Sequence, residues 1–467
     1  MTQHVQKRSG WRRLEPLLAI LVGVGILVQV VRWGGTAKGG PLYALGIALM
    51  LGILLVFGGA VWWLYFSALP NAKVQPSRMS NGQAQTLASG IVIAGMLFLV
   101  GGFWDEMWHR TYGGFGNDFL WPPHMLLYAS ILAFTVFAGL GMFLTMRGAG
   151  SIRERFRSEP LLGMVGLVSS YLLVSLPSDE LWHRIYGLDL TAWSLPHLSL
   201  TFGVMLIMLA GIMVQLNLLP AREWRGLAAM QWGEWLVLVL IAWAVSVIVQ
   251  IGVTEWDNIK TSTIPDVFVD AFWQRPEWLY PVVVVAIALW AGNLALHTTR
   301  RIGTATLVAL LVIGFRLLLI TALGRDLPNG EMRFTSHLLL LAPALALDCW
   351  AWATLRRPQT PWLLVAGNLV AALVFFAVNL PLIARTMAFP RLNSTTLPAV
   401  FGYGLLMALL AGGLGAVLGR WLGSWGHAQA AGAAFARSRL AWGTVGACVV
   451  VLALVLVLML TANPPTM

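Results

Sequence analysis

Long apolar runs alternate with short polar connections along the whole chain. Each run approaches the roughly 20 residues that an α-helix needs to cross a bilayer. We therefore expect an all-α polytopic membrane protein with about 13 transmembrane helices, within a range of 12–14. The expected spans are residues 16–33, 42–68, 87–104, 124–145, 160–177, 197–219, 233–253, 279–297, 304–323, 338–354, 362–384, 400–418 and 440–461.

The composition agrees with this pattern. Of the 467 residues, 58% are hydrophobic and 10% charged, and the mean hydropathy is +0.77, whereas soluble domains are about 25% charged. This excludes a soluble globular, disordered or nucleic-acid-binding protein, despite the net charge of +11. The two cysteines, Cys349 and Cys448, form no CxxC motif. The first span lacks a small-residue cleavage site, so we expect an anchor there.

The basic residues indicate an orientation. One alternate set of connections carries 19 Lys and Arg and the other carries 10. The positive-inside rule places the first set and the N-terminus in the cytoplasm, as in a multi-pass protein of the bacterial inner membrane. The acids follow the opposite bias: 13 of 19 lie in the outward connections 105–123, 178–196, 254–278 and 324–337. Acids contribute little to topology, so their clustering calls for another explanation, and these connections are where we look for functional residues.

Two of these connections share a nine-residue motif. Residues 105–113 read D-E-M-W-H-R-T-Y-G and residues 179–187 read D-E-L-W-H-R-I-Y-G. A short loop follows each, and then Pro-His opens the next span, at His124 and at His197. The same pattern at the same place in two successive hairpins indicates an internal repeat.

The spacing favours a metal site. Asp and His at positions i and i+4 lie on one face of a helix, and Pro favours the first turn of the next helix. One carboxylate and two imidazoles can then converge across each hairpin, a set that suits copper, zinc or non-haem iron. The expected ligands are Asp105, His109, His124, Asp179, His183 and His197. The neighbouring acids are expected to orient ligand histidines; they are Glu106, Asp118, Glu180 and Asp189.

A structural interpretation is the main alternative for these hairpins. Asp–His and Asp–Arg pairs could close the two loops, because Arg110 and Arg184 stand beside the histidines. However, a structural loop does not require an acid and two histidines in the same relation twice. Fainter echoes at 273–280 and 325–337 suggest degenerate copies of the hairpin. We therefore divide the chain into an N-terminal two-helix segment (1–86), the duplicated hairpins (87–220) and a C-terminal membrane region (221–467).

Two further features lie inside the expected spans. Arg316 and Asp348 are charges at membrane depth, which are costly there, and we expect them to pair with each other or to line a polar cavity. The glycines of residues 412–415 predict close helix packing.

The repeated motif resembles the C subunit of the particulate methane and ammonia monooxygenases. The resemblance covers about residues 85–220 and implies copper at Asp105, His109 and His124, with a second set at Asp179, His183 and His197. The second set departs from the family, which has an amide in the place of Asp179. This chain is also much longer, and nothing in it resembles the soluble copper domain of the family's partner subunit.

The leading hypothesis is an integral membrane metalloprotein with Asp-His-His copper sites at the outer membrane face, as a monooxygenase-like or quinol-linked oxidoreductase subunit. One alternative is a metal or small-solute transporter or a copper-delivery protein. Another is a structural subunit of a larger membrane complex. The expected partners are the lipid bilayer and either other membrane subunits or a periplasmic protein, and no nucleic acid.

Overall fold

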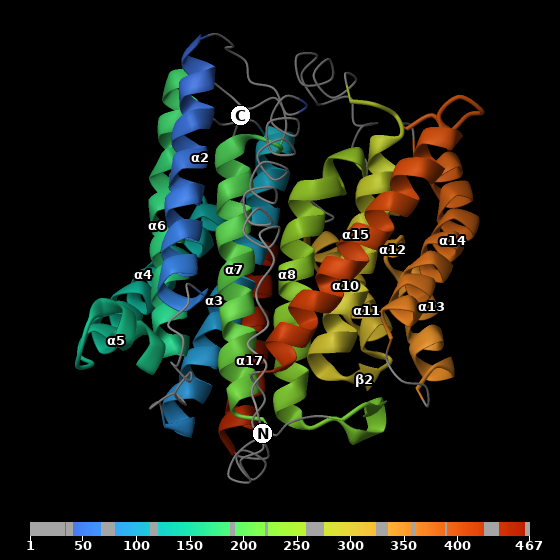
Figure 1. The fold of residues 1–467 in the computed structure, drawn as a ribbon. Coiled ribbons are helices and arrows are strands. Elements are labelled where there is room, and N and C mark those ends of the chain that lie inside the picture. Colours follow the sequence, from blue (N-terminus) through green and yellow to red (C-terminus); the bar gives the residue numbers. More distant parts are fainter. Residues whose placement is uncertain are drawn as a thin grey trace, which may run out of the picture.

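The described part of the protein is a bundle of long antiparallel helices (Figure 1). The computed structural model describes residues 33, 41–66, 80–112, 120–186, 192–219, 223–257, 275–323, 335–355, 360–387, 390–424 and 439–462. The helices are α2 (Pro41–Val61) with a π-helical turn η2 (Trp62–Phe66), α3 (Asn81–Tyr112), α4 (Pro122–Met146), α5 (Ile152–Ser158), α6 (Pro160–Tyr186), α7 (Leu195–Asn217), the 3-10 turn η3 (Leu227–Ala229), α8 (Trp232–Asp257), α10 (Leu279–Thr299), α11 (Thr304–Leu323), α12 (Thr335–Leu338), α13 (Leu341–Ala353), α14 (Pro361–Thr386), α15 (Leu397–Gly423) and α17 (Arg439–Thr461).

These helices confirm an all-α polytopic fold. Among the described residues, 10 helices are long and apolar enough to cross a membrane, or 11 if the bent pair of α5 and α6 forms one span. The described apolar part of α17 is shorter, at Gly446–Thr461. Of the expected span at 16–33, the structure describes residue 33 alone, so the total of about 13 spans stays a prediction.

Two helices continue beyond the apolar runs that predicted them. We expected spans ending at residues 104 and 177, but α3 continues to Tyr112 and α6 to Tyr186. Each extension carries one copy of the repeated motif, and the next residue in the sequence is a glycine, Gly113 or Gly187. Polar residues such as Glu and Arg are good helix formers, so polarity alone does not end a helix. Hydropathy therefore located the apolar segments and underestimated the helix lengths.

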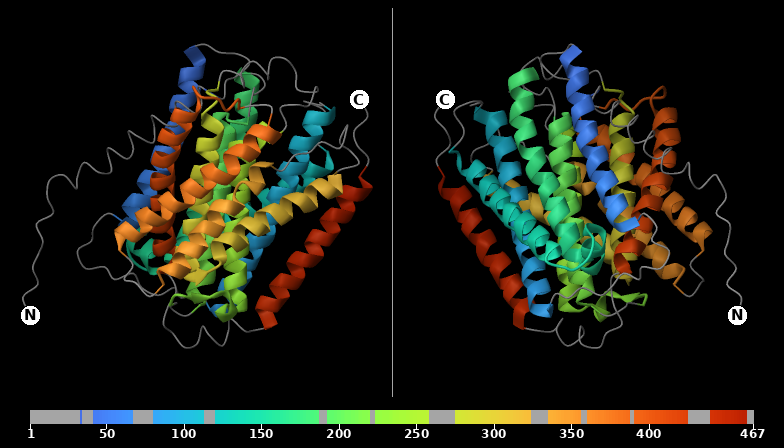
Figure 2. Two further views of the ribbon diagram at one scale, coloured as in Figure 1. Left: turned by 90° about the vertical axis from the view of Figure 1, so that its right-hand side faces the viewer. Right: turned by 60° about the vertical axis from the view of Figure 1, so that its left-hand side comes forward.

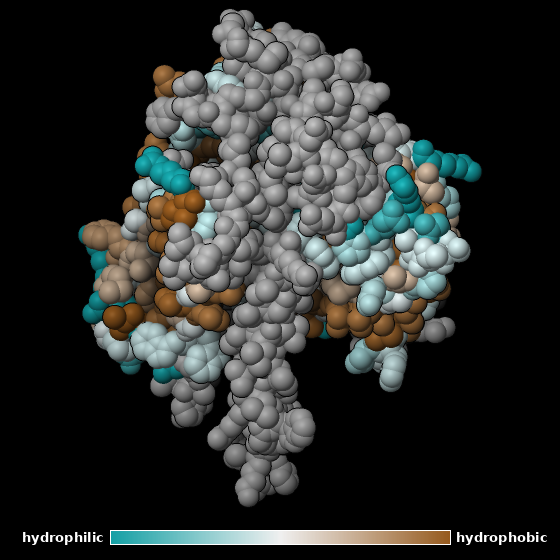
Figure 3. All heavy atoms as spheres, turned by 90° about the horizontal axis from the view of Figure 1, so that it is seen from above, coloured by the Kyte–Doolittle hydropathy of each residue, from teal (hydrophilic) through white to brown (hydrophobic). Residues whose placement is uncertain are grey.

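The core of the bundle lies at α7, α8 and α10. Within the span, 89% of α10 is buried inside the protein and 72% of α8, compared with 28% of α4. The chain winds around this centre, so that α4 and α6 lie on one side and α13 and α14 on the other (Figures 1 and 2). Exposed Leu, Val and Phe side chains cover the peripheral helices. Seen from above, apolar side chains lie at the left and at the lower right of the molecule, between more polar ones (Figure 3).

Glycines set the closest helix contacts. In α15, Gly415, Gly419 and Gly423 follow one another at four-residue intervals against the backbone of α10. A Cβ at Gly415 would come within 3.0 Å of the Trp290 Cα atom, so no larger residue fits without a shift. The expected packing role of 412–415 is thus confirmed at Gly415, while a Cβ at Gly413 would meet nothing within 4 Å.

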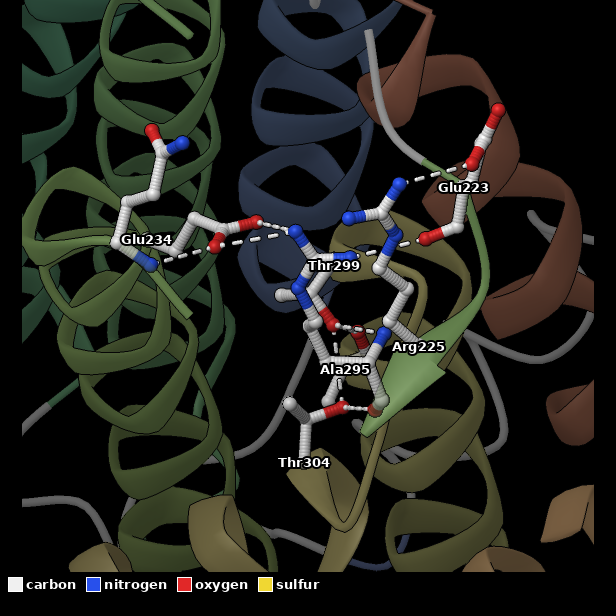
Figure 4. A network of polar contacts seen from close by, with 8 residues as sticks. Glu223, Arg225, Glu234, Ala295, Thr299 and Thr304 are labelled. Carbon is white, nitrogen blue, oxygen red and sulfur yellow. Dashed lines mark hydrogen bonds and ion pairs between the residues drawn. The ribbon is translucent and has the colours of Figure 1, made fainter. Parts of the chain in front are cut away.

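One end of the bundle is held by a polar network between α8, α10 and α11 (Figure 4). A two-residue parallel strand pair, β1 (Arg225–Gly226) with β2 (Arg301–Ile302), joins the connections there. Arg301 forms a buried ion pair with Glu234 at 3.1 Å and donates to the Glu223 carbonyl oxygen at 2.9 Å. The arginine-rich connection after α10 is therefore anchored to the start of α8.

Asp348 corrects one of our expectations. Its carboxylate accepts hydrogen bonds from the backbone N–H groups of Gly303 and Thr306, both at 2.7 Å, and from the Thr306 hydroxyl at 2.6 Å. Asp348 therefore caps the first turn of α11. Arg316 lies about three turns further along α11, with its guanidinium carbon 3.9 Å from the centre of the Phe103 ring. The expected pairing of Arg316 with Asp348 is wrong, because the free N–H groups at a helix start bind a carboxylate.

Candidate metal centre

The first repeated hairpin brings Asp105 and His124 together. Asp105 lies near the end of α3, and His124 lies in the first turn of α4. The His124 Nε2 atom is 2.7 Å from the Asp105 Oδ1 atom, and the two side chains are 16% and 22% exposed. A carboxylate and an imidazole thus converge in a partly buried position at the mouth of the hairpin.

The local sequence explains this approach. Trp121 precedes a proline and is extended, as that position favours, and Pro122 and Pro123 then open α4. On α3, one turn before Asp105, Gly101 has no side chain, and a Cβ there would lie 3.1 Å from the Pro123 carbonyl oxygen. The absence of that atom lets the start of α4 lie against α3, which places His124 beside Asp105.

Aromatic residues surround the pair. The His124 ring lies 6.4 Å from the ring of Trp121 and 6.0 Å from that of Tyr128, measured between centroids. Trp108 contacts Trp121 at 5.7 Å and Trp104 at 5.1 Å. Trp104 and Trp108 are fully buried, in an apolar cluster that includes residues of α11 and α17. This shell limits water access from the bundle side and strengthens electrostatic interactions at the pair.

The other residues of the first set are placed less completely. His109 lies in α3 one turn after Asp105, so its backbone is on the expected helix face, but its side chain is outside the described part. Asp118 lies outside the described residues. Glu106 accepts a hydrogen bond from the Gln250 amide of α8 at 3.3 Å. Glu106 therefore connects the end of α3 to α8.

In the second hairpin, the structure describes the backbone and one of the candidate ligands. Asp179, Glu180 and His183 all lie in the helical extension of α6, with side chains outside the described part, and Asp189 lies outside it entirely. His197 lies in the first turn of α7. Its backbone N–H donates to the Ser194 hydroxyl at 3.4 Å, so Ser194 caps the helix.

A buried ion pair anchors the loop that leads to His197. Arg275 donates to Glu255 at 2.8 Å, and the two side chains are 0% and 7% exposed. The other Glu255 oxygen accepts from the backbone N–H of Ala192. The Arg275 guanidinium lies 4.2 Å from the centre of the Trp193 ring and 4.8 Å from that of Trp256. Glu255 in the last turn of α8 and Arg275 just before α10 thus fix the entry to α7.

Sequence reasoning did not predict this anchor. The tryptophan-rich stretch at 273–280 was interpreted as an echo of the hairpin, and no contact was assigned to it. The available signal was the presence of an acid and an arginine near two tryptophans, in connections where most acids gather. Asp257 also has a structural role, since it accepts from the Ser336 backbone N–H at 3.1 Å.

No group of three or more His, Cys, Asp or Glu side chains converges among the described residues. The described side chains do not include those of His109, Asp179 and His183. Asp105 and His124 therefore make a two-residue arrangement that a third ligand would complete. The chain matches no protein family, no curated protein and no solved structure.

Proposed function

We propose that this protein is an integral membrane metalloprotein in which Asp105, His109 and His124 bind one transition-metal ion. The second copy of the motif, with Asp179, His183 and His197, is proposed to bind another. The observation that supports the proposal is the 2.7 Å approach of His124 to Asp105 across the α3–α4 hairpin.

The spacing of the two atoms suits a shared metal ion. Two ligand atoms that each lie about 2 Å from one ion, at tetrahedral or square angles, are roughly 3 Å apart. The Asp105 and His124 atoms approach this separation. Because α3 is helical through Tyr112, residue 109 stands one turn from Asp105 and is the natural third ligand.

The donor set restricts the metal. Imidazole with carboxylate suits copper, zinc or non-haem iron, and the resemblance to the monooxygenase C subunit favours copper. Bound copper would supply redox chemistry towards dioxygen, in a monooxygenase-like or quinol-linked oxidoreductase subunit. The roles proposed for the chain's own residues are to hold the ion with Asp105 and His124 and to exclude water with Trp104 and Trp108.

The proposed location is the extracytoplasmic side of a bacterial inner membrane. The apolar helices support a bilayer environment. The repeated motifs lie at the end of the bundle opposite the connections at 147–159 and 300–303 (Figure 1). These connections belong to the set richer in Lys and Arg, which the positive-inside rule assigns to the cytoplasm.

Elemental analysis of the purified protein tests the proposal. We expect about one equivalent of copper per intact motif, and loss of about one equivalent in His124→Ala and in Asp105→Ala. His297→Gln is the matched control, because His297 lies in the last turn of α10, against Trp224, and belongs to neither copy of the motif. The proposal would be overturned if the folded wild-type protein, after incubation with copper, zinc or iron, retained none of these metals.

The same contact also supports a purely structural function, as an ion pair that closes the hairpin. On that hypothesis, His124→Ala would lower thermal stability, and metal addition would not raise the unfolding midpoint of the wild type. If metal binds, oxidation assays and metal flux into liposomes separate an oxidoreductase from a transporter. Co-purification of stoichiometric subunits would favour a role within a larger complex.

A further inference from the structure

The corner between α4 and α6 carries an unusual density of arginine. The short helix α5 meets α6 at an angle of 111°, so it lies across the direction of the bundle helices (Figure 1). Residues 147–159 contain four arginines and two acids. One acid, Glu154, is held in a capping box, where it accepts from the Ser151 backbone N–H at 2.7 Å and from the Ser151 hydroxyl at 2.9 Å.

Two of these arginines lie on the same face of α5. Arg153 and Arg157 are four residues apart and both reach the turn η2. The Arg153 guanidinium carbon lies 5.8 Å from the centre of the Trp63 ring, and Arg157 donates to the Leu64 carbonyl oxygen at 3.0 Å. Burial and then the charge of Arg153 lower the pKa of Arg157. An anion bound beside these two guanidinium groups would be attracted by both charges.

Exposed apolar side chains adjoin the arginines. Trp62 and Trp63 are 55% and 48% exposed, and Phe143 and Ile152 are exposed as well. The Arg147 guanidinium carbon lies 4.2 Å from the centre of the Phe143 ring. Cationic heads beside exposed aromatic and aliphatic groups are typical of residues at the interface between lipid headgroups and acyl chains.

We propose that this corner binds the headgroup of an anionic phospholipid, with Arg153 and Arg157 as the residues that hold its phosphate. The neighbouring apolar side chains favour a lipid over a soluble anion, because they would contact the acyl chains. This site is separate from the proposed metal centre, since it lies at the opposite ends of α4 and α6.

Reconstitution in nanodiscs of defined composition tests the proposal. The wild type is placed in phosphatidylcholine alone or with phosphatidylglycerol, and the unfolding midpoint and the lipids retained in native mass spectrometry are measured. We expect phosphatidylglycerol to raise the midpoint of the wild type. The double variant Arg153→Gln/Arg157→Gln should bind this lipid roughly thirty-fold more weakly and lose the rise in midpoint.

Two controls separate the site from general charge effects. Arg225→Gln removes an exposed cation elsewhere in the chain, paired with Glu223, and should keep the wild-type response. Arg153→Lys/Arg157→Lys keeps the charge and should retain most of the binding, even if the glutamine variant folds poorly. Equal midpoints of the wild type in both lipid mixtures would overturn the proposal. So would an equal gain in the glutamine variant, or a gain of the same size from inorganic phosphate in detergent.

Discussion

At the scale of residues, the candidate centre depends on the absence of a side chain at Gly101. Asp105 and His124 belong to different helices, and their 2.7 Å contact requires α3 and α4 to approach closely at Gly101. The next glycine, Gly102, is different, because a Cβ there would lie 4.0 Å from its nearest neighbour, in Leu127. Substituting these two adjacent glycines therefore distinguishes the effect of close helix packing from the effect of losing a glycine.

Gly101→Leu should push α4 away from α3 and cost roughly 1–3 kcal/mol of unfolding free energy, as overpacking does. It should also lower metal retention, because His124 moves with α4. Gly102→Leu should change the stability by about 0.5 kcal/mol or less. Unfolding in detergent and elemental analysis of both variants measure these effects, and equal losses in the two variants would contradict the packing argument.

The buried Glu255–Arg275 pair gives a second prediction at this scale. Arg275→Met leaves the Glu255 charge buried without its partner and should cost about 3–5 kcal/mol. The double variant Arg275→Met/Glu255→Gln should recover part of that loss. A double-mutant cycle from unfolding midpoints measures the coupling, and strictly additive losses would show that the pair contributes no interaction energy.

At the scale of elements, small residues decide which helices approach most closely. The glycines of α15 lie along the backbone of α10, which is also the most buried of the candidate spans. In a membrane, association of helices depends on such close packing, because lipid tails are as apolar as the side chains. The face of α15 that carries Gly415 is therefore constrained, whereas the face that carries Gly413 is not.

Gly415→Leu should prevent the close contact of α15 with α10 and destabilise the protein by more than 1 kcal/mol. Gly413→Leu, two residues away, should be tolerated, because its side chain would enter open space. Thermal unfolding of the two variants in the same detergent provides the comparison. Similar destabilisation by both substitutions would contradict the orientation of α15 about its axis, in which Gly415 faces α10 and Gly413 does not.

At the scale of the whole molecule, the apolar pattern predicted the positions of the helices well and their contacts poorly. Transmembrane runs are visible in sequence because a bilayer demands them. Asp348 accepts from two backbone N–H groups and one threonine hydroxyl at the start of α11, and the backbone partners are not visible in any side-chain pattern. The Asp105–His124 contact was expected from the repeat, whereas the contact of Glu106 with Gln250 depends on how α3 meets α8.

The orientation of the bundle yields a prediction at the same scale. With Cys349 and Cys448 replaced by serine, Leu120→Cys should react with a membrane-impermeant thiol reagent added outside intact cells. Ala149→Cys should react only after the cells are permeabilised, because it lies in an arginine-rich connection. The reverse labelling pattern would place the motifs in the cytoplasm and would exclude a periplasmic partner.

The anchor formed by Glu255 and Arg275 has a consequence for how the polypeptide is assembled. The entry to α7 is completed by residues that are synthesised after α7, since Ala192 contacts Glu255 in the last turn of α8 and Trp193 contacts Arg275, which precedes α10. A ribosome that has released only the first 220 residues has therefore not yet supplied the groups that fix this loop. The loop before the second hairpin's α7 therefore gains all of these contacts only after residue 275 has been synthesised.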